Sequence, residues 1–334
     1  MEIRQITNKQ EWEDFAKKQS ETIMTQSSNY GDFFESMGEE SWVFGVYEDE
    51  KLIGGSLVVS THAKRGSFLY LPYGPIGNIT KILKPLTKYL KQFAKYNNYD
   101  FIRVSPFLLE TNKELFENLG YKNAPMHVLA ETTWLLDLKK SEDQLLADMN
   151  KNHRNLIRRC IKEGVLIEKS EDPKALEDFN KLHDFTAKRH KFTRFSNDYV
   201  DKEFEAFKPG EALVYKAYLP DGKLDTSSVI FYYGNMACYR HSASLLQNNK
   251  IPTSYLLQWE SIKEAKNRGM EYYNFWGIAP ENSSKKHPFF GITHFKKGFG
   301  GFQKDLLHCQ DLPITKKYWI NWTVETLRRI KRGF

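Results

Sequence analysis

The chain has 334 residues, of which 40% are apolar, 27% are charged and 14% are aromatic. This composition is typical of an ordinary soluble globular protein with about two domains, and no run approaches the roughly 18 apolar residues of a membrane span. The formal net charge of +7 favours anionic partners such as phosphate-bearing molecules, nucleic acid or an acidic membrane surface, although a basic surface also serves solubility.

Three cysteines, Cys160, Cys238 and Cys309, lie far apart and form no CxxC pair. Their odd number and spacing argue against a disulfide framework and a structural zinc site, and they fit a reducing compartment. The first fifteen residues, MEIRQITNKQEWEDF, contain no apolar signal-peptide segment. We therefore expect a cytoplasmic protein that binds no metal.

Two segments of the chain share one layout. Each begins with strand-like stretches around a hairpin-type turn, continues with an amphipathic helix, and ends in a buried strand followed by proline. The turn residues Asp49 and Asp221 lie 172 positions apart (221 − 49), and the terminal prolines Pro106 and Pro280 lie 174 apart (280 − 106). Because this offset is nearly constant across several elements, we expect an internal duplication rather than a chance similarity.

Helical patterns lie between the two copies. Ser141 is a suitable N-cap for a helix from about Glu142, and a second helix, RNLIRRCIKE, ends at Gly164. The stretch EDPKALEDFNKLHDFTAKRH predicts a further amphipathic helix. The domain boundaries that follow are 1–145 for the first domain, 146–312 for the second and 313–334 for a C-terminal basic amphipathic helix.

Five short motifs occur in a fixed order along the chain: YLPYGPIG, NHRNLIRRCIKEGV, TAKRHKFTRFSNDYV, YYNFWGIAP and GITHFKKGFGG. With these motifs the sequence resembles the Fem-type (FemABX) peptidoglycan-bridge aminoacyltransferases. The resemblance implies an α+β fold of two tandem GNAT-like (acyl-CoA N-acyltransferase-like) domains, with the C-terminal helix packing on the first. The chain departs from the family pattern at Tyr73, where a basic residue is frequent, and at Ser105, where some relatives carry Asp.

The resemblance also implies a function. Such enzymes move an amino acid from aminoacyl-tRNA to the stem peptide of a peptidoglycan precursor, either a UDP-muropeptide or lipid II. Conversion of an ester into an amide runs downhill, so we expect no cofactor, and the sequence has no GxxxxGK[ST] loop for ATP. The implied partners are aminoacyl-tRNA and the precursor peptide, and we expect a monomer.

The stretch HPFFGITHFKKGFGG, His287 to Gly301, combines aromatic, basic and glycine residues. We expect a strand whose glycines let the backbone approach a substrate. The family match places the catalytic lysine at Lys296. Phe295 would either anchor the segment or flank the acceptor, and Lys296 or Lys297 would hold a negative charge of the substrate. A cation here would hold a carboxylate, the terminal phosphate-sugar edge of the tRNA or the developing oxyanion. The alternative is a lysine-rich hairpin with both amines in solvent.

Three further residues match positions that contact the acceptor in relatives: Arg194, Tyr199 and, less closely, Arg189. Arginine suits bidentate binding of phosphate or carboxylate. A solvated arginine-rich helix end would also explain Arg194, and a structural ion pair would explain Arg189. The cationic helix at 154–162 either contacts tRNA phosphates or is a charged surface.

The tail KKYWINWTVETLRRIKRGF combines Trp319 and Trp322 with a terminal Arg/Lys cluster. Docking of this helix on the first domain explains the pattern best, and peripheral contact with anionic lipid at the inner membrane surface is the alternative. Two other functions remain open for the whole chain. One is an acyl-CoA-dependent GNAT N-acyltransferase on another amine, although no clean Q/R-x-x-G-x-G/A loop is present. The other is a non-catalytic relative that binds RNA or membrane.

Overall fold

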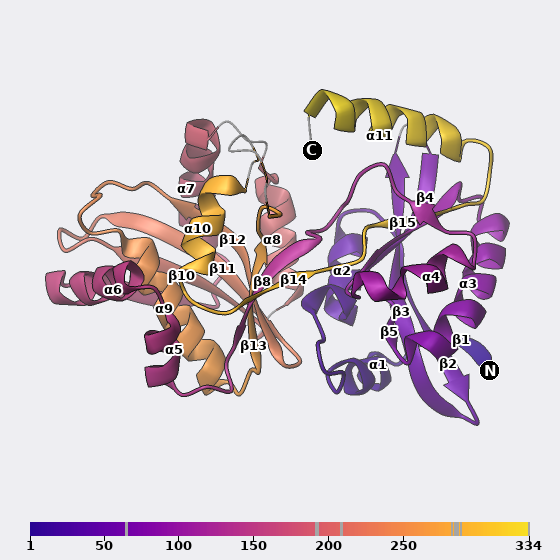
Figure 1. The fold of residues 1–334 in the computed structure, drawn as a ribbon, viewed down its shortest axis with the longest axis horizontal. Coiled ribbons are helices and arrows are strands. Elements are labelled where there is room, and N and C mark those ends of the chain that lie inside the picture. The colour runs from indigo at the N-terminus through magenta and orange to yellow at the C-terminus, as the bar shows by residue number, and fades with distance from the viewer. Residues whose placement is uncertain are drawn as a thin grey trace. The chain divides into compact units, whose positions relative to one another are not determined.

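The computed structural model describes residues 1–63, 66–190, 194–207, 210–281, 283, 287 and 289–332. The chain forms two compact units, one made of Met1–Thr132 with Lys304–Phe334 and the other of Thr133–Gln303. Each unit has one β-sheet with helices packed on it (Figure 1).

The first unit has an eight-stranded sheet in the order β1-β2-β3-β4-β6-β15-β7, with β5 paired to β3. Its strands are β1 (Glu2–Gln5), β2 (Ser41–Glu48), β3 (Lys51–Ala63), β4 (Gly66–Tyr73), β5 (Ile76–Gly77), β6 (Phe101–Pro106), β7 (Lys122–Asn123) and β15 (Gln310–Pro313). Its helices are α1 (Lys9–Ala16), α2 (Ser28–Ser36), α3 (Ile79–Tyr96), α4 (Lys113–Glu117) and α11 (Tyr318–Arg332), with 3-10 turns at Met24–Gln26 and Glu110–Asn112.

The second unit has a seven-stranded sheet in the order β14-β8-β13-β12-β11-β10-β9. Its strands are β8 (Thr132–Asp137), β9 (Leu166–Ser170), β10 (Ala212–Tyr218), β11 (Leu224–Tyr233), β12 (Met236–Ser244), β13 (Tyr272–Gly277) and β14 (Phe302–Asp305). Its helices are α5 (Glu142–Asp148), α6 (Lys151–Glu163), α7 (Ala175–His190), α8 (Asn197–Ala206), α9 (Thr253–Asn267) and α10 (Phe290–Lys297).

The two sheets share one topology. In the first unit, β2, β3 and β4 are antiparallel, α3 follows, and β6 pairs in parallel with β4. In the second unit, β10, β11 and β12 are antiparallel, α9 follows, and β13 pairs in parallel with β12. This confirms the fold predicted from the sequence, two α+β domains of the same kind in tandem.

The boundaries between the units differ from the predicted positions at 145/146 and 312/313. The chain divides after Thr132 and after Gln303. The reason is that the strand following each copy completes the sheet of the other copy: β8 pairs with β13, and β15 pairs with β6. The C-terminal helix, predicted as a separate segment, is part of the first unit.

Several helices begin and end where the sequence predicts. The Ser141 side chain accepts from the backbone N–H of Gln144, and the Gln144 side chain accepts from Ser141 N–H, a capping box at the start of α5. Gly164 ends α6 with a φ of 83°, which favours glycine. In α9 the buried side chains include the predicted set, which is Leu256, Leu257, Trp259, Ile262 and Ala265.

Residues on β6 alternate between the two faces of the first sheet. Ile102 and Val104 join the apolar cluster that also contains Leu86 and Leu90 of α3. Because successive strand residues point to opposite faces, Arg103 lies on the other side. This places Arg103 where it can bind the C-terminal helix.

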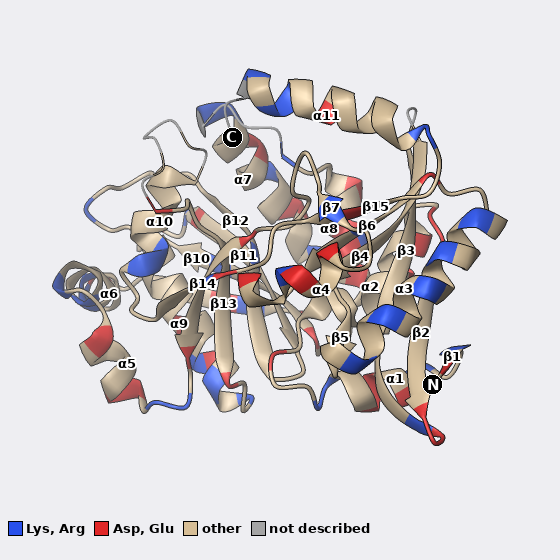
Figure 2. Ribbon diagram, turned by 45° about the vertical axis from the view of Figure 1, so that its right-hand side comes forward, with Lys and Arg blue, Asp and Glu red and all other residues tan. Residues whose placement is uncertain are grey.

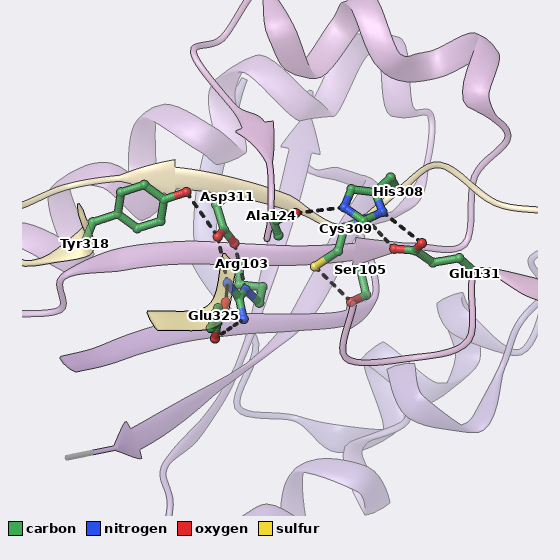
Figure 3. Close-up of polar contacts among 9 residues, drawn as sticks. All are labelled: Arg103, Ser105, Ala124, Glu131, His308, Cys309, Asp311, Tyr318 and Glu325. Atoms are coloured by element: carbon green, nitrogen blue, oxygen red, sulfur yellow. Dashed lines mark hydrogen bonds and ion pairs between the residues drawn. The ribbon is translucent and has the colours of Figure 1, made fainter. Parts of the chain in front are cut away.

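A buried ionic network attaches α11 to the first sheet (Figure 3). Arg103 donates two hydrogen bonds of 2.7 Å to Asp311 on β15 and two more, of 3.1 and 2.7 Å, to Glu325 on α11. The Tyr318 hydroxyl donates to Asp311 at 3.3 Å, and its ring packs edge-on against Phe101. These contacts confirm that the C-terminal helix packs on the first domain. Among the described residues, no helix is both long and apolar enough to cross a membrane.

Substitution Arg103→Met is expected to destabilise the protein by about 3–5 kcal/mol, because two acidic side chains then lose their shared cation and Asp311 stays buried. Urea unfolding of the purified protein measures this change. Glu325→Gln serves as the control, since it leaves the buried Arg103–Asp311 pair intact and is expected to cost only about 1 kcal/mol. Equal stability of Arg103→Met and the wild type would contradict the proposed attachment.

Candidate active site in the second unit

Two parallel strand pairs, β12 with β13 and β4 with β6, differ in how far they stay together. In the second unit, β12 and β13 pair only from Met236/Tyr272 to Cys238/Asn274, although β12 continues to Ser244 and β13 to Gly277. In the first unit, β4 and β6 remain paired from Phe68/Phe101 to Tyr73/Pro106. The second sheet is therefore split between two neighbouring strands, and backbone groups beyond the split are available for other contacts.

A β-bulge on β12 places two consecutive basic residues, Arg240 and His241, on one acidic partner. Val229 pairs with His241 and Ile230 with Tyr239, so Arg240 is the extra residue. Arg240 Nε donates to Glu203 Oε1 at 3.0 Å, and His241 Nε2 lies 2.5 Å from Glu203 Oε2. Burial would raise the pKa of the Glu203 carboxyl, but Arg240 and His241 hold that pKa below its usual value. The cluster thus holds the Arg240 guanidinium in place.

Arg240, which belongs to β12, also contacts β13 across the strand split. Its guanidinium carbon is 4.7 Å from the centre of the Trp276 ring on β13, within cation–π range. Its Nη2 donates to the Tyr199 hydroxyl at 3.2 Å, and the Tyr199 ring stacks on Phe195 at 4.3 Å. Arg240 therefore connects the predicted acceptor residue Tyr199 with the end of β13.

The end of β13 has a strained backbone. Trp276 has a φ of 65°, a value that bulky residues rarely adopt. Asn274 Oδ1 accepts from Trp276 N–H at 2.8 Å, and the Thr133 hydroxyl donates to Trp276 O at 3.2 Å. Strain of this kind costs about 1–3 kcal/mol and is concentrated at functional sites. We therefore take the end of β13 as part of the candidate site.

Lys296 lies in the interior beside this strand end. Its side chain is only 5% exposed, and its Nζ donates to the carbonyl oxygen of Gly277 at 2.6 Å. Lys296 has no ion pair with a residue in the described part of the chain. Burial lowers the pKa of the Lys296 amine to about 7, so its neutral and charged forms are both populated near neutral pH.

The segment that carries Lys296 is helix α10, not the strand we expected for His287 to Gly301; within that range Pro288 lies outside the described residues. Most of the glycines follow the helix instead of interrupting it, since Gly298 is its C-cap. Phe295 and Phe299, one helical turn apart, pack on the core of the second unit. The helical turn buries these rings and the Lys296 amine together.

Two glycines of this segment, Gly298 and Gly301, allow close contacts within the protein. A Cβ at Gly298 would lie 2.0 Å from the His153 ring, and a Cβ at Gly301 would lie 2.2 Å from Leu135 O. His153 Nε2 in turn lies 2.9 Å from Phe295 O and Nδ1 lies 2.8 Å from Asn150 Oδ1. The expected approach of glycine backbone to a substrate therefore does not describe Gly298 and Gly301, which instead let α6 and β8 pack closely.

The other predicted residues take different places. Phe295 is partly buried against the core, and Lys297 Nζ lies 3.2 Å from Gln303 Oε1 and 5.0 Å from the Trp134 ring centre. Arg194 pairs with Asp184 at 2.5 Å and donates to Phe195 O. Arg189 is exposed and donates to Leu245 O at 2.8 Å.

The contacts therefore join only some of the predicted residues to one another. Tyr199 and Lys296 both reach the end of β13, Tyr199 through Arg240 on Trp276 and Lys296 through Gly277. Arg194 adjoins Phe195, which stacks on Tyr199. Lys297 contacts Gln303 on β14, and Arg189 contacts Leu245 just after the end of β12.

Three residues of this site escaped prediction from the sequence: Glu203, Arg240 and Trp276. The adjacent Arg240 and His241 point in opposite directions in a regular strand, and only the bulge directs both at Glu203. The motif YYNFWGIAP contains Trp276, and its position directly before Gly277 at a strand end was the available signal. A positive φ at tryptophan is not visible in a sequence.

The two departures from the family pattern lie inside the first unit. Tyr73 is buried and donates to Ala130 O at 2.7 Å. Ser105 is buried between Tyr70 and Cys309, with hydrogen bonds of 3.2 and 3.5 Å (Figure 3 shows the bond to Cys309). Both side chains are thus used by contacts within that unit.

The fold and the split second sheet define a protein of the tandem GNAT-like class. A solved tandem GNAT protein from the clavulanic acid biosynthesis pathway has a TM-score of 0.55 at 11% identity, over 94% of this chain and 98% of that one. A crystal structure of FemX has a TM-score of 0.86 at 17% identity, over 97% of this chain and 100% of that one. At these identities the likeness shows the fold.

A family model described as the FemAB family matches residues 7–226 and 224–326, and the chain belongs to this family. A lipid II:glycine glycyltransferase from Staphylococcus epidermidis is 21% identical over 378 aligned residues, covering 90% of both proteins. The aminoacyltransferase FemA from Staphylococcus aureus is 29% identical over 104 residues, or 31% of this chain and 22% of FemA. These relatives confirm the predicted class of enzyme, an acyltransferase.

The stability of the wild type should depend on pH through Lys296. The unfolded chain binds this proton up to the ordinary pKa of 10.5 and the folded protein only up to about 7, so stability rises with pH between these values by up to about 5 kcal/mol. Lys296→Met lacks this dependence. We expect the variant to be more stable than the wild type near neutral pH and to lose that advantage as the pH approaches 10.5.

Urea unfolding at a series of pH values measures the free energy of unfolding of the wild type and of Lys296→Met. The titration of all other groups largely cancels in the difference between these two free energies. The exposed Lys223→Met variant is the control for loss of a lysine. A difference between wild type and Lys296→Met that stays constant with pH would contradict the lowered pKa.

Proposed function

We propose that this chain transfers an aminoacyl group from aminoacyl-tRNA to an amine of the stem peptide in a peptidoglycan precursor. The observation that carries the proposal is the similarity over 90% of both chains to a lipid II:glycine glycyltransferase, within the FemAB family. The buried amine at the strand split supplies a chemically suitable site for such a reaction.

The reaction balances without a cofactor. The acceptor nitrogen attacks the ester carbonyl carbon, the bond from that carbon to the tRNA ribose oxygen breaks, and an amide forms. One proton leaves the nitrogen, and the ribose oxygen takes one up. A side-chain amine of ordinary pKa must first lose its extra proton, which costs about 4 kcal/mol near neutral pH. A group that accepts protons near pH 7 lowers the barrier for the later proton transfer.

In this proposal Lys296 is the catalytic residue. Its neutral form accepts the proton of the attacking nitrogen, and the resulting ammonium returns a proton to the leaving ribose oxygen. Its bond to Gly277 O holds the amine at the end of β13. A pKa of about 7 suits this role, because an efficient acid–base group titrates near the working pH.

Tyr199 and Arg194 are proposed to bind the acceptor, with Arg240 as a positioning residue. Arg240 is held by Glu203 and Trp276 and donates to the Tyr199 hydroxyl, so it orients Tyr199. Arg194 is partly buried, and its exposed partner Asp184 can give way to an acidic group of the substrate. A stem peptide offers carboxylates for such a contact.

The decisive experiment incubates the protein with a pool of aminoacyl-tRNAs and either a UDP-linked muropeptide or its lipid-linked form. Mass spectrometry should reveal a precursor whose mass has grown by one amino-acid residue. Omission of tRNA should abolish the product. Absence of product with every pair, together with acetyl-CoA turnover on an amine, would instead identify an acyl-CoA-dependent N-acyltransferase.

Lys296→Met should lower kcat by about 10²–10⁴-fold, the usual contribution of a general base. The wild-type rate should fall as the pH drops below about 7, since protonated Lys296 cannot accept a proton. Steady-state kinetics over a pH series measures both effects, with Lys223→Met as the matched lysine control. Full activity of Lys296→Met would remove Lys296 from the mechanism.

Helix α6 is the proposed contact for tRNA phosphates. Lys151, Arg158 and Lys162 are exposed and line one side of this helix at spacings of seven and four residues. His153 joins the same helix to α10 next to Lys296. Cations along a helix suit the nucleic-acid backbone, which binds through salt-sensitive phosphate contacts.

The double variant Arg158→Ser/Lys162→Ser should raise the KM for aminoacyl-tRNA roughly tenfold and lower the salt slope of binding by about one per lost contact. Filter binding at several salt concentrations measures the slope. The control is Lys84→Ser/Lys88→Ser on α3, a lysine-rich helix of the first unit. Loss of tRNA binding in the control alone would move the contact to α3.

A further inference from the structure

Helix α11 is attached to the first unit through polar side chains. Tyr318 is buried and bonds to Asp311, and Glu325 bonds to Arg103. These two residues are seven positions apart and therefore lie on one side of the helix. The side that faces the protein is thus marked by a hydroxyl and a carboxylate.

The opposite side of α11 is apolar and exposed. We call it the outer face, and it consists of Trp319 (45% exposed), Ile320 (59%), Leu327 (62%) and Ile330 (69%). A helix on the surface of a globular protein ordinarily buries its apolar side and exposes its polar side. In α11 these four large apolar side chains are instead exposed, and such a grouped apolar surface usually marks a binding site.

Only cations accompany the outer face. Glu325 is the one acidic residue in α11, and it is occupied by Arg103. Arg328, Arg329 and Lys331 are exposed near the end of the helix, where Figure 2 shows a group of basic residues. Lys122 Nζ lies 5.0 Å above the Trp319 ring. The surface therefore combines apolar side chains with a positive charge that no acid of the helix offsets.

We propose that the outer face of α11 lies in the surface of an anionic lipid bilayer. A short helix with an apolar side and flanking Lys and Arg binds in the plane of such an interface, where the apolar side chains enter the acyl boundary and the cations meet lipid phosphates. With 15 residues, α11 is about 22 Å long, which suits lying along the surface. The inference rests on the proposed function for its purpose: it would bring the enzyme to a lipid-linked acceptor.

The charges distinguish this occupant from a second copy of the chain. Two outer faces packed against each other would add the cations of a second copy, while Glu325, the one acid of each helix, is already paired with Arg103. An anionic bilayer neutralises the same cations. The charge pattern therefore favours lipid.

The test measures co-flotation of the full chain with vesicles of phosphatidylglycerol and phosphatidylcholine, and with vesicles of phosphatidylcholine alone. Neither vesicle contains a lipid-linked acceptor, so binding is measured apart from catalysis. The variant Leu327→Glu/Ile330→Glu places two acids on the outer face. The matched control, Leu166→Glu, changes a leucine of β9 that is 57% exposed.

We expect the wild type and Leu166→Glu to float with the anionic vesicles, less so at high salt, and the double variant to bind at least about tenfold more weakly. Arg328→Ser/Arg329→Ser should also weaken binding. This second variant keeps the test valid if Leu327→Glu/Ile330→Glu fails to fold. The proposal would be overturned if the wild type did not bind the anionic vesicles. It would also be overturned if the wild type, Leu327→Glu/Ile330→Glu and Arg328→Ser/Arg329→Ser bound them equally. Self-association that the double variant abolishes, without vesicle binding, would identify a second copy as the occupant.

A second assay tests the membrane proposal separately from the proposed function. It measures aminoacyl transfer to a soluble UDP-linked acceptor. The double variant should retain that activity while losing transfer to an acceptor embedded in vesicles. Vesicle binding without any transfer would leave the membrane surface standing and reject the proposed function. Transfer to both acceptors without vesicle binding would support the proposed function and reject the membrane surface.

Discussion

Lys296 places an amine in the interior of the second unit, where its Nζ donates a hydrogen bond to the carbonyl oxygen of Gly277. Burial of a charged amine is costly, and burial therefore lowers the pKa of Lys296, so that the protein holds this proton less tightly. The carbonyl is available because β13 has already separated from β12 at this point. The chemistry proposed for the chain depends on this combination of a split sheet and a weakly basic lysine.

The two copies of the fold have taken different roles. In the first, β4 and β6 remain paired to their ends, and Tyr73 and Ser105 are enclosed by their own unit. In the second, the strands part, a bulge turns Arg240 toward Glu203, and Trp276 adopts a strained backbone. One unit thus holds the C-terminal helix, and the other holds the candidate site.

Much of the architecture was predictable, because local patterns specify helices and strands. The capping residue Ser141, the final Gly164 and the apolar spacing of α9 each define an element by interactions a few residues apart. The domain limits were displaced because pairing of β8 with β13 and of β15 with β6 joins residues more than 130 positions apart. Strand pairing at such distances leaves no local signal.

By itself, the sequence determined the repeated layout, the α+β class and the family resemblance, since these are carried by composition, spacing and motifs. The catalytic role of Lys296 stays a prediction. Tertiary structure alone decided that Lys296 lies on a helix and points inward, and that Arg240 and His241 share Glu203. It also decided that α11 presents its apolar side to the outside. The physical reason is that burial, and with it the pKa of an amine or the exposure of a helix face, depends on which distant residues pack against it.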